Sequence, residues 1–418
     1  MAAESFVLRG GTLVDGTGSD PLEDASVVVR GSEIHSVGRG NDVEVPDGAR
    51  VIDVRGRTVL PGLIDSHLHF LGLSGGPFIS ESLVVPQGVK LLRAAQSARA
   101  VLEAGFTTAK DTGGMNAIHL KRAVDEGTIP GPRILAAGYV LTQTAGHGDD
   151  YHFLPVEWAD ARTSEGKTHA LICDGVDECI RAARYAFRDG ADFIKVCTSG
   201  GVSSQTDKPE DVQFSHEEVS AIVEVARKVG SFVTTHCMSS EGMLMSIESG
   251  VRTIDHAWYP TEEVIELGRK KGTVFVSTLS AFKRIEEEGG TFADWEIRKS
   301  RGKLAEIGKN MRRLKDGGAT VASGTDYIDT PLMKMGTNAL ELELLVKYAG
   351  FTPMESIVSM TANGALACGM EGRIGTVEKG RLADLLVVKR NPLEDIGSLQ
   401  SPADVESVVK GGAFVKRA

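Results

Sequence analysis

Between residues 59 and 372, short β-prone runs alternate with segments of helical periodicity. The candidate strands are 59–65, 106–110, 133–139, 191–197, 231–236, 252–256, 272–277 and 319–324, and clear helical segments such as 216–229 and 297–315 lie between most of them. Strands that alternate with helices form parallel sheets, because each helix carries the chain back along the sheet. Eight such units in about 300 residues predict an α/β fold, a (β/α)8 TIM-like barrel. A doubly wound open sheet is the structural alternative.

The two ends of the chain have a different texture. Residues 5–58 consist of short β-prone runs separated by Gly and Asp turns, and the same pattern returns in 382–388 and 405–415. This pattern is typical of small antiparallel sheets. We therefore expect residues 1–58 and 373–418 to form one composite β-sandwich domain beside a barrel of residues 59–372.

Side chains that bind metals lie on or just after several predicted strands. They are His67, His69, Lys195, His236, His256 and Asp326. Residues i and i+2 of a strand point to the same face, so the first two imidazoles can reach one cation. The active site of a barrel forms at the carboxyl ends of its strands, and an open sheet would not explain this placement. Imidazole and carboxylate ligands suit Zn²⁺, so the pattern predicts a metal-dependent hydrolase.

Lys195 and Asp326 each have a purely structural alternative. Lys195 lies between apolar residues on a predicted strand, where a lysine can snorkel or pair with a carboxylate. Burial also lowers a lysine pKa, and the free amine can capture carbon dioxide to give a bridging carbamate. Asp326 follows Gly324, which permits a tight turn; it can cap the next segment or act as a general base.

Composition limits the classes of partner and compartment. The net charge is −11, from 46 basic and 57 acidic residues, which disfavours nucleic acids and anionic membranes as partners. The five cysteines form no CxxC pair, which is typical of reduced thiols in a cytoplasmic protein. No apolar run is long enough to span a bilayer, and the amino terminus lacks the apolar region of a signal peptide. A signal peptide already removed is left open.

Short sequence strings around the candidate ligands carry a family resemblance. They are Leu60-Pro-Gly-Leu-Ile-Asp-Ser-His-Leu-His69, Phe193-Ile-Lys-Val196 with Ser199-Gly-Gly-Val202, Thr234-Thr-His236, Thr253-Ile-Asp-His256 and Ala322-Ser-Gly-Thr-Asp326. With these strings and the tail 372–388, nearly the whole chain resembles the amidohydrolase superfamily. It is most similar to the imidazolonepropionase-related branch, which includes Xaa-Pro dipeptidases, carboxypeptidase-like enzymes and ochratoxin-hydrolysing amidohydrolases.

The resemblance implies a site with two divalent metal ions, for which Zn²⁺ is expected. His67, His69 and Asp326 would hold one ion, His236 and His256 the other, and a carbamate on Lys195 would bridge them. Asp326 would act as the catalytic base. The implied reaction is hydrolysis of a small-molecule amide, a dipeptide or N-acyl amino acid, with release of the C-terminal amino acid. A bulky aromatic acyl group, as in ochratoxin A, is the sharper expectation.

The substrate contacts follow from the same resemblance. Gly200, Gly201 and Val202 form a substrate loop, and His147 is expected near the carbonyl or the terminal carboxylate, with a structural role as the alternative. Many dipeptidase members carry a Tyr where this chain has Met238, which offers no O–H donor but lines apolar pockets well. The second metal alone or a donor from a loop would replace it. The long segment 140–175, which includes Tyr151, His152 and Trp158, is the expected substrate loop.

Two other functions are alternatives to the hydrolysis of a linear amide. The first is a cyclic-amide hydrolase of the imidazolonepropionase or dihydropyrimidinase kind, which would share the metals but close around a small ring. The second is a non-catalytic oligomeric scaffold, which the intact set of six candidate ligands disfavours. The resemblance also implies a homo-oligomer, up to an octamer.

Overall fold

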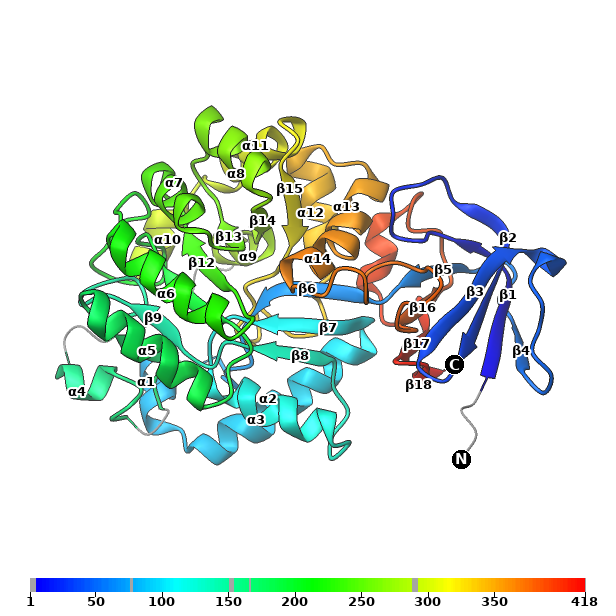
Figure 1. Ribbon diagram of the computed structural model, residues 1–418, viewed down its shortest axis with the longest axis horizontal. Helices are drawn as coiled ribbons and strands as arrows, with labels where there is room; N and C mark the ends of the chain where they lie inside the picture. Colours follow the sequence, from blue (N-terminus) through cyan, green and yellow to red (C-terminus); the bar gives the residue numbers. More distant parts are fainter. Residues whose placement is uncertain (1–4, 76–77, 150–153, 165–166, 288–291, 418) are drawn as a thin grey trace.

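The computed structural model describes residues 5–75, 78–149, 154–164, 167–287 and 292–417. Figure 1 shows a barrel with its ring of helices on one side and a separate β-sheet on the other, with both chain ends at the sheet. The α/β fold with a barrel and a separate β domain from the two termini is therefore confirmed. Within the described residues no helix has the length and apolar character needed to cross a membrane.

Eight parallel strands correspond to the eight predicted ones. They are β6 (Leu63–Leu68), β7 (Phe106–Asp111), β8 (Arg133–Ala136), β11 (Ile194–Cys197), β12 (Val233–Cys237), β13 (Thr253–His256), β14 (Val274–Ser277) and β15 (Thr320–Ser323). Two short strands extend this sheet: β9 (Val140–Thr142) pairs with β11, and β10 (Ala170–Ile172) pairs with β9 at the edge. A parallel bridge between Leu68 and Tyr327 connects β6, in the three-stranded sheet β6-β7-β8, to the segment after β15, the last strand of the seven-stranded sheet. Every residue of β6 and β11 to β14 is buried, as expected for a parallel sheet covered by helices.

Helices surround the barrel. They are α2 (Gln87–Glu103), α3 (Met115–Asp125), α5 (Val176–Arg188), α6 (His216–Lys228), α7 (Ser240–Ser249), α8 (Glu262–Lys271), α11 (Leu304–Asp316), α12 (Leu340–Ala349), α13 (Pro353–Ser359) and α14 (Ala362–Ala367). Successive helices contact one another from α5 to α8 and from α11 to α14, as do α2 and α3. Local sequence explains their ends. Ser215 and Glu218 form a capping box at the start of α6, so the predicted helix 216–229 is found within one residue.

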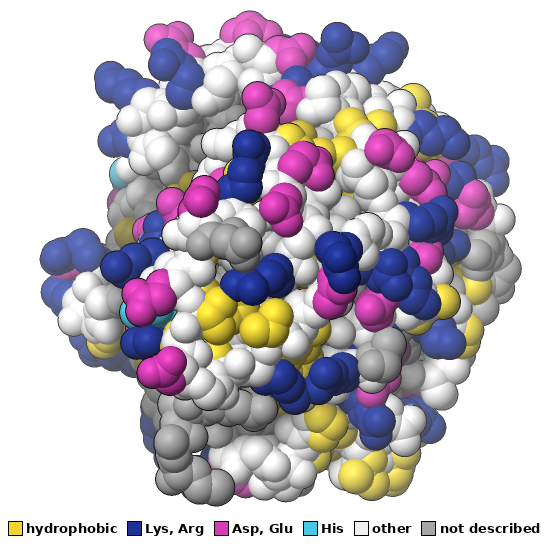
Figure 2. All heavy atoms as spheres, turned by 90° about the vertical axis from the view of Figure 1, so that its right-hand side faces the viewer, with side chains coloured by type: hydrophobic (Ala, Val, Ile, Leu, Met, Phe, Trp, Pro, Cys, Tyr) yellow, Lys and Arg dark blue, Asp and Glu magenta, His cyan; other side chains and the backbone are white. Residues whose placement is uncertain are grey.

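The terminal sheet combines both ends of the chain. Its strands are β1 (Ser5–Leu13), β2 (Leu22–Arg30), β3 (Glu33–Arg39), β4 (Arg50–Asp53), β5 (Thr58–Pro61), β16 (Leu385–Val388), β17 (Val405–Lys410) and β18 (Ala413–Arg417). The central strand β5 pairs with β1 on one side and β16 on the other. The sheet has a hydrophobic core of its own, which includes Phe6, Leu8 and Leu385. Figure 2 shows basic and acidic side chains interspersed over the face at this end of the molecule.

Three predicted segments differ from the structure, each at a glycine. The predicted strand 59–65 is two strands, because the chain leaves the terminal sheet after β5 and Gly62 precedes the first barrel strand. The predicted strand 133–139 ends at Ala136, and Gly138 adopts a left-handed φ of +70° before β9 begins. The predicted helix 297–315 is divided between α10 (Asp294–Ser300) and α11, with Gly302 at a φ of +72° between them.

Candidate metal centre and active site

The candidate ligands come from five strands or the turns that follow them. His67 lies on β6, Lys195 on β11, His236 on β12 and His256 ends β13, while His69 and Asp326 follow β6 and β15. Because these strands are parallel, their carboxyl ends open on the same side of the barrel. The fold therefore brings together side chains that are up to 260 positions apart in sequence.

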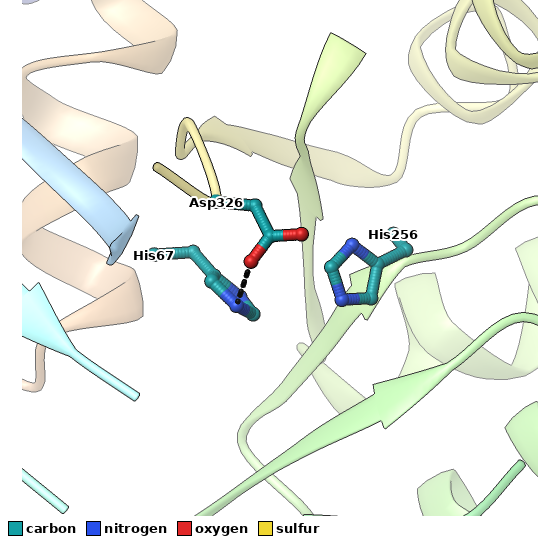
Figure 3. Close-up of side chains that lie close together, drawn as sticks. All are labelled: His67, His256 and Asp326. Carbon is teal, nitrogen blue, oxygen red and sulfur yellow. Dashed lines mark ion pairs between the residues drawn. The ribbon is translucent and has the colours of Figure 1, made fainter. Parts of the chain in front are cut away.

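Figure 3 shows His67, His256 and Asp326 directed toward one another. One potential ligand atom of each residue lies within 4.8 Å of the others. The Oδ1 atom of Asp326 is 3.3 Å from Nε2 of His67 and also 3.3 Å from Nε2 of His69. Ligand atoms that each lie roughly 2 Å from one zinc ion are separated by roughly 3 Å. The distances from Asp326 to His67 and to His69 therefore fit a cation that these three side chains share.

The outer ring nitrogens of three histidines are held by neighbouring groups. The Nδ1 atom of His67 lies 2.9 Å from Asp255 Oδ2, that of His69 lies 2.8 Å from Gly113 O, and that of His256 lies 2.8 Å from Thr278 Oγ1. Histidine ligands are usually oriented by such a hydrogen bond through the nitrogen that does not face the metal. Nε2 is thus the nitrogen that each of these rings offers to a cation.

His236 has the opposite orientation. Its Nε2 donates to the carbonyl of Gly200 over 3.0 Å, which leaves Nδ1 as the nitrogen available to a cation. The ring centroid of His256 lies 4.9 Å from that of His67 and 4.6 Å from that of His236. The candidate ligands of the two expected ions are therefore neighbours in one cluster.

Asp255 is a functional candidate that the sequence analysis missed. This fully buried carboxylate accepts from His67 Nδ1 and, over 2.8 Å, from the ammonium of buried Lys195. The pairing of Lys195 with a carboxylate is the structural alternative considered above. Asp255 directly precedes His256 on the buried strand β13. An acidic residue is uncommon at such a position, and this is the signal that could have identified it from the sequence.

The protonation states of most of the cluster suit metal binding. Burial holds the pKa of His236 and of His256 well below the usual value, so both imidazoles are neutral. Burial would raise the pKa of Asp326, but its contacts with His67 and His69 outweigh burial and hold it well below the usual range. Burial would lower the pKa of His69, and the same carboxylate raises it overall. A cation bound between these two side chains would compete with the proton that the Asp326 contact favours on His69.

Two candidate ligands have an unusual backbone conformation. His256 has a φ of +74° and Asp326 a φ of +56°, both in the left-handed region that non-glycine residues rarely adopt. The backbone N–H of Asp326 donates to His67 O over 2.7 Å, which holds the turn against β6. Gly324 serves a different purpose from the expected tight turn, since a Cβ there would lie 2.6 Å from the Cβ of His67. Such conformations collect at functional sites.

A cavity of about 630 Å³ opens beside the cluster. Its lining includes His147, Val202 and Met238, as well as His169, which is not one of the candidate residues named from the sequence. Burial lowers the pKa of His169 to about 3. Most of the remaining lining is apolar, from Leu71, Leu73, Leu83, Leu154, Phe282, Ile285, Phe292, Trp295, Ile328 and Met333. A cavity of this size and character accommodates a drug-sized organic ligand.

The loop 200–202 after β11 contacts the histidines of the site largely through its backbone. Gly200 O binds His236, and a Cβ at Gly201 would lie 2.3 Å from Cε1 of His147. The His147 ring stacks on His236 at 4.0 Å between centroids, and its Nδ1 lies 2.9 Å from Ser204 Oγ. Gly201 thus allows the loop to approach His147 closely, whereas a Cβ at Gly200 would lie 2.1 Å from the carbonyl oxygen of Lys208.

The segment 140–175 is more ordered than a simple loop. It contains β9, the short helix α4 (Val156–Ala159) and β10. Trp158 is 59% exposed and does not belong to the cavity lining, and Tyr151 and His152 lie outside the described residues. Arg162 binds Asp160 and the carbonyl of Ile172, so its guanidinium is occupied away from the cavity.

Comparisons with known proteins agree with this geometry. The model of the amidohydrolase family matches residues 58–415. An ochratoxinase from Aspergillus niger is 33% identical over 99% of this chain and 87% of its own length, and its crystal structure superposes with a TM-score of 0.88 over 100% and 97% of the two chains. An imidazolonepropionase from Symbiobacterium thermophilum is 26% identical over 98% and 96%.

A solved Xaa-Pro dipeptidase with bound methionine in its active site is also similar. It is 32% identical to this chain, with a TM-score of 0.88 over 99% of this chain and 100% of that one. The sequence resemblance to the imidazolonepropionase-related branch is confirmed by these matches. The chain belongs to the amidohydrolase family and is a hydrolase that acts on amide bonds.

Proposed function

We propose that this protein is a binuclear metal-dependent amidohydrolase that cleaves dipeptides or N-acyl amino acids and releases the C-terminal amino acid. One observation carries the proposal. The ligand atoms of His67, His69, His256 and Asp326 converge at the wall of a large apolar cavity. The similar proteins named above include an ochratoxinase and an Xaa-Pro dipeptidase, which favours linear amides with a carboxyl-terminal amino acid.

The donor set fits two divalent ions, for which we propose zinc. His67, His69 and Asp326 would hold one, and His236 and His256 the other. When bound, such ions supply Lewis acidity that polarises a carbonyl group and makes water a stronger acid. The neutral His236 and His256 and the ionised Asp326 are the protonation states that metal ligation requires.

Lys195 is the proposed bridging ligand. Its ammonium group would first lose one proton. The free amine would then bond to the carbon of carbon dioxide and release a second proton, which gives the anionic carbamate. The nitrogen keeps one N–H after this reaction, so it can still donate to Asp255, which accepts from it over 2.8 Å. The ion pair seen in the structure and the proposed carbamate therefore use the same hydrogen-bond partner.

Asp326 is the proposed base. Its carboxylate faces the cavity and is held by its backbone bond to His67 O. It would take a proton from the attacking water and pass it to the amine nitrogen as the carbon–nitrogen bond breaks. His147, whose ring is fixed by His236 and Ser204, would contact the carbonyl or the terminal carboxylate of the substrate.

The cavity lining also constrains the substrate. Lys195 is its one Lys or Arg among the described residues, so the terminal carboxylate would be met by neutral donors such as Ser203 and Gln205 or by His147. Met238 is buried in this lining and has no hydroxyl group. The hydroxyl groups of the described lining that could donate in place of the missing Tyr are those of Ser203 and Thr330. The apolar remainder favours a bulky acyl group, as in ochratoxin A.

The test is mass spectrometry of a mixed substrate library incubated with zinc-loaded and metal-stripped protein. The library holds Xaa-Pro, Xaa-Phe and Xaa-Lys dipeptides, N-acyl amino acids, ochratoxin A and several cyclic amides. Zinc-dependent release of a terminal amino acid supports the proposal. Ring opening with every linear amide intact assigns the protein to the cyclic-amide hydrolases instead, and equal activity after metal removal contradicts the metal dependence.

A further inference from the structure

The aromatic part of the cavity wall comes from one stretch of chain. Apart from histidines, the aromatic side chains of the described lining are Phe282, Phe292 and Trp295. Phe282 belongs to α9 (Leu279–Glu287), and the other two lie just before and within α10. Leu71, Leu73, Leu83 and Leu154, which come from other stretches of the chain, make an aliphatic part of the lining. The cavity therefore has one aromatic side, built by the segment after β14.

The ring of Trp295 is held in a fixed orientation. Its indole Nε1 donates to the carbonyl of Ser203 over 2.9 Å, across 92 positions of sequence. Ser203 lies in the loop after β11 and also borders the cavity. Because the N–H edge of the indole binds this loop, its orientation is set before a ligand arrives. A preoriented aromatic ring offers a large contact area with little loss of conformational entropy.

Lys299, one turn later on α10, connects the same two segments. Its side chain is 12% exposed, and its ammonium donates to Gly201 O over 2.8 Å and to Ser204 O over 2.6 Å. It also lies 3.3 Å from the carboxylate of buried Asp207. A single cation thus holds α10 to two backbone carbonyls and one side chain of the loop.

The loop held by Lys299 is the one that positions two imidazoles of the site. Ser204 contacts His147, whose Nδ1 is also 3.5 Å from Asp207, and Gly200 O binds His236. A displacement of α10 would therefore reach the loop and, through it, the ring of His147. The aromatic wall and the candidate catalytic residues are mechanically connected through Lys299.

We propose that Trp295 is a specificity-determining residue that recognises an aromatic ring of the substrate. Lys299 is the positioning residue that holds α10, and with it Trp295, against the loop after β11. The ring can belong to the acyl group or to the side chain of the C-terminal amino acid, since both lie next to the scissile amide. The proposal rests on the proposed function and deepens it.

The experiment compares kcat/KM of metal-loaded enzyme for naphthoyl-alanine, acetyl-phenylalanine and acetyl-alanine. Two selectivity ratios, each relative to acetyl-alanine, report recognition of an acyl ring and of a side-chain ring. Trp295→Ala should lower one of these ratios by about 10-fold or more, and Trp295→Phe should keep most of it. Arg298→Ala, at an exposed position of the same helix, is the matched control and should leave both ratios unchanged. Two ratios within about twofold of those of the unaltered enzyme in Trp295→Ala would overturn the proposal.

Lys299 is tested by Lys299→Met and Lys299→Arg. Lys299→Met should lower kcat on all three substrates and also lower the selectivity ratio for an aromatic substrate. Lys299→Arg, which keeps the positive charge, should keep both close to the values of the unaltered enzyme. A selectivity ratio does not depend on the fraction of enzyme that is folded, so a loss of stability alone cannot imitate this result. An unchanged ratio and kcat in Lys299→Met would refute the positioning role.

A binding experiment separates this inference from the proposed function. If the metal-loaded protein cleaves no linear amide, the proposed function fails, and the same three compounds are then titrated as ligands. Tighter binding of an aromatic compound, with a fluorescence change that Trp295→Phe abolishes, supports the aromatic wall. Equal affinity for all three compounds refutes it.

Discussion

Replacing Asp255 with Asn tests the central structural claim about the metal centre. The Asp255 carboxylate is fully buried and accepts from His67 Nδ1 over 2.9 Å and from Lys195 Nζ over 2.8 Å. An Asn side chain keeps the volume but loses the charge, and one of its two polar atoms becomes a donor facing another donor. His67 would then lose the partner that turns its Nε2 toward the cation.

The expected magnitude has two parts. Loss of a group that orients a metal ligand typically lowers metal affinity 10–100-fold, which is about 1.4–2.7 kcal/mol. In addition, the ammonium of Lys195, 3% exposed, would remain buried without its counter-charge, at a cost of about 3–5 kcal/mol in the free energy of unfolding of the metal-free protein. The affinity loss tests the role of Asp255 at the metal centre, and the stability loss alone does not.

The assay is zinc titration against a competing chelator, with thermal unfolding of the metal-free protein measured in parallel. Asp384→Asn is the matched control, because Asp384 is also buried and binds Arg133 over 2.6 Å but contacts none of the candidate ligands. It should lose stability and keep zinc affinity. Wild-type zinc affinity in Asp255→Asn would refute the claim that this carboxylate orients His67.

Four other outcomes are expected. Lys195→Ala should lower the zinc content measured by mass spectrometry, and unchanged zinc content with unchanged turnover would rule out a bridging carbamate. Asp326→Asn should keep the fold and lower kcat about 10²–10⁴-fold, so near-normal turnover would refute its role as base. Gly201→Ala places a Cβ 2.3 Å from a neighbouring imidazole and should lower kcat about tenfold, unlike Gly88→Ala, which meets nothing within 4 Å; equal kinetics would contradict the close approach. Burial raises the pKa of Glu341 from 4.5 to about 7, so its contribution to stability, about 3 kcal/mol, is present below pH 4.5 and lost as the pH rises through 7. Urea unfolding midpoints of the unaltered protein and of Glu341→Gln should therefore converge or cross between pH 5 and 8, and parallel curves would contradict the raised pKa.

Local sequence was sufficient for the type and order of most elements. Eight apolar runs separated by amphipathic segments indicated the barrel, and the returning β pattern at the ends indicated the terminal sheet. The boundary between the two was not readable from local pattern. Residues 59–64 form an apolar run interrupted by a single glycine, and only pairing of β5 with β1 and β16 separates it from β6. Burial of both strands makes their sequences equally apolar.

The candidate ligands were readable for a related reason. Histidine, lysine and aspartate are rare at the buried ends of strands, so their presence there is informative. Asp255, which orients His67, is also an aspartate at a buried strand end and carries the same signal. The partner of His69 carries none, because the group that holds it is the backbone carbonyl of Gly113.

The alternation of strands and helices and the side chains at the strand ends could thus be inferred from the chain alone, because both depend on residues close together in the chain. The tertiary structure alone decided which groups hold those side chains, and that Trp295 and Lys299 join the cavity wall to the loop after β11. Contacts between residues nearly a hundred positions apart leave no periodicity in a sequence. Their geometry exists only once the barrel has closed.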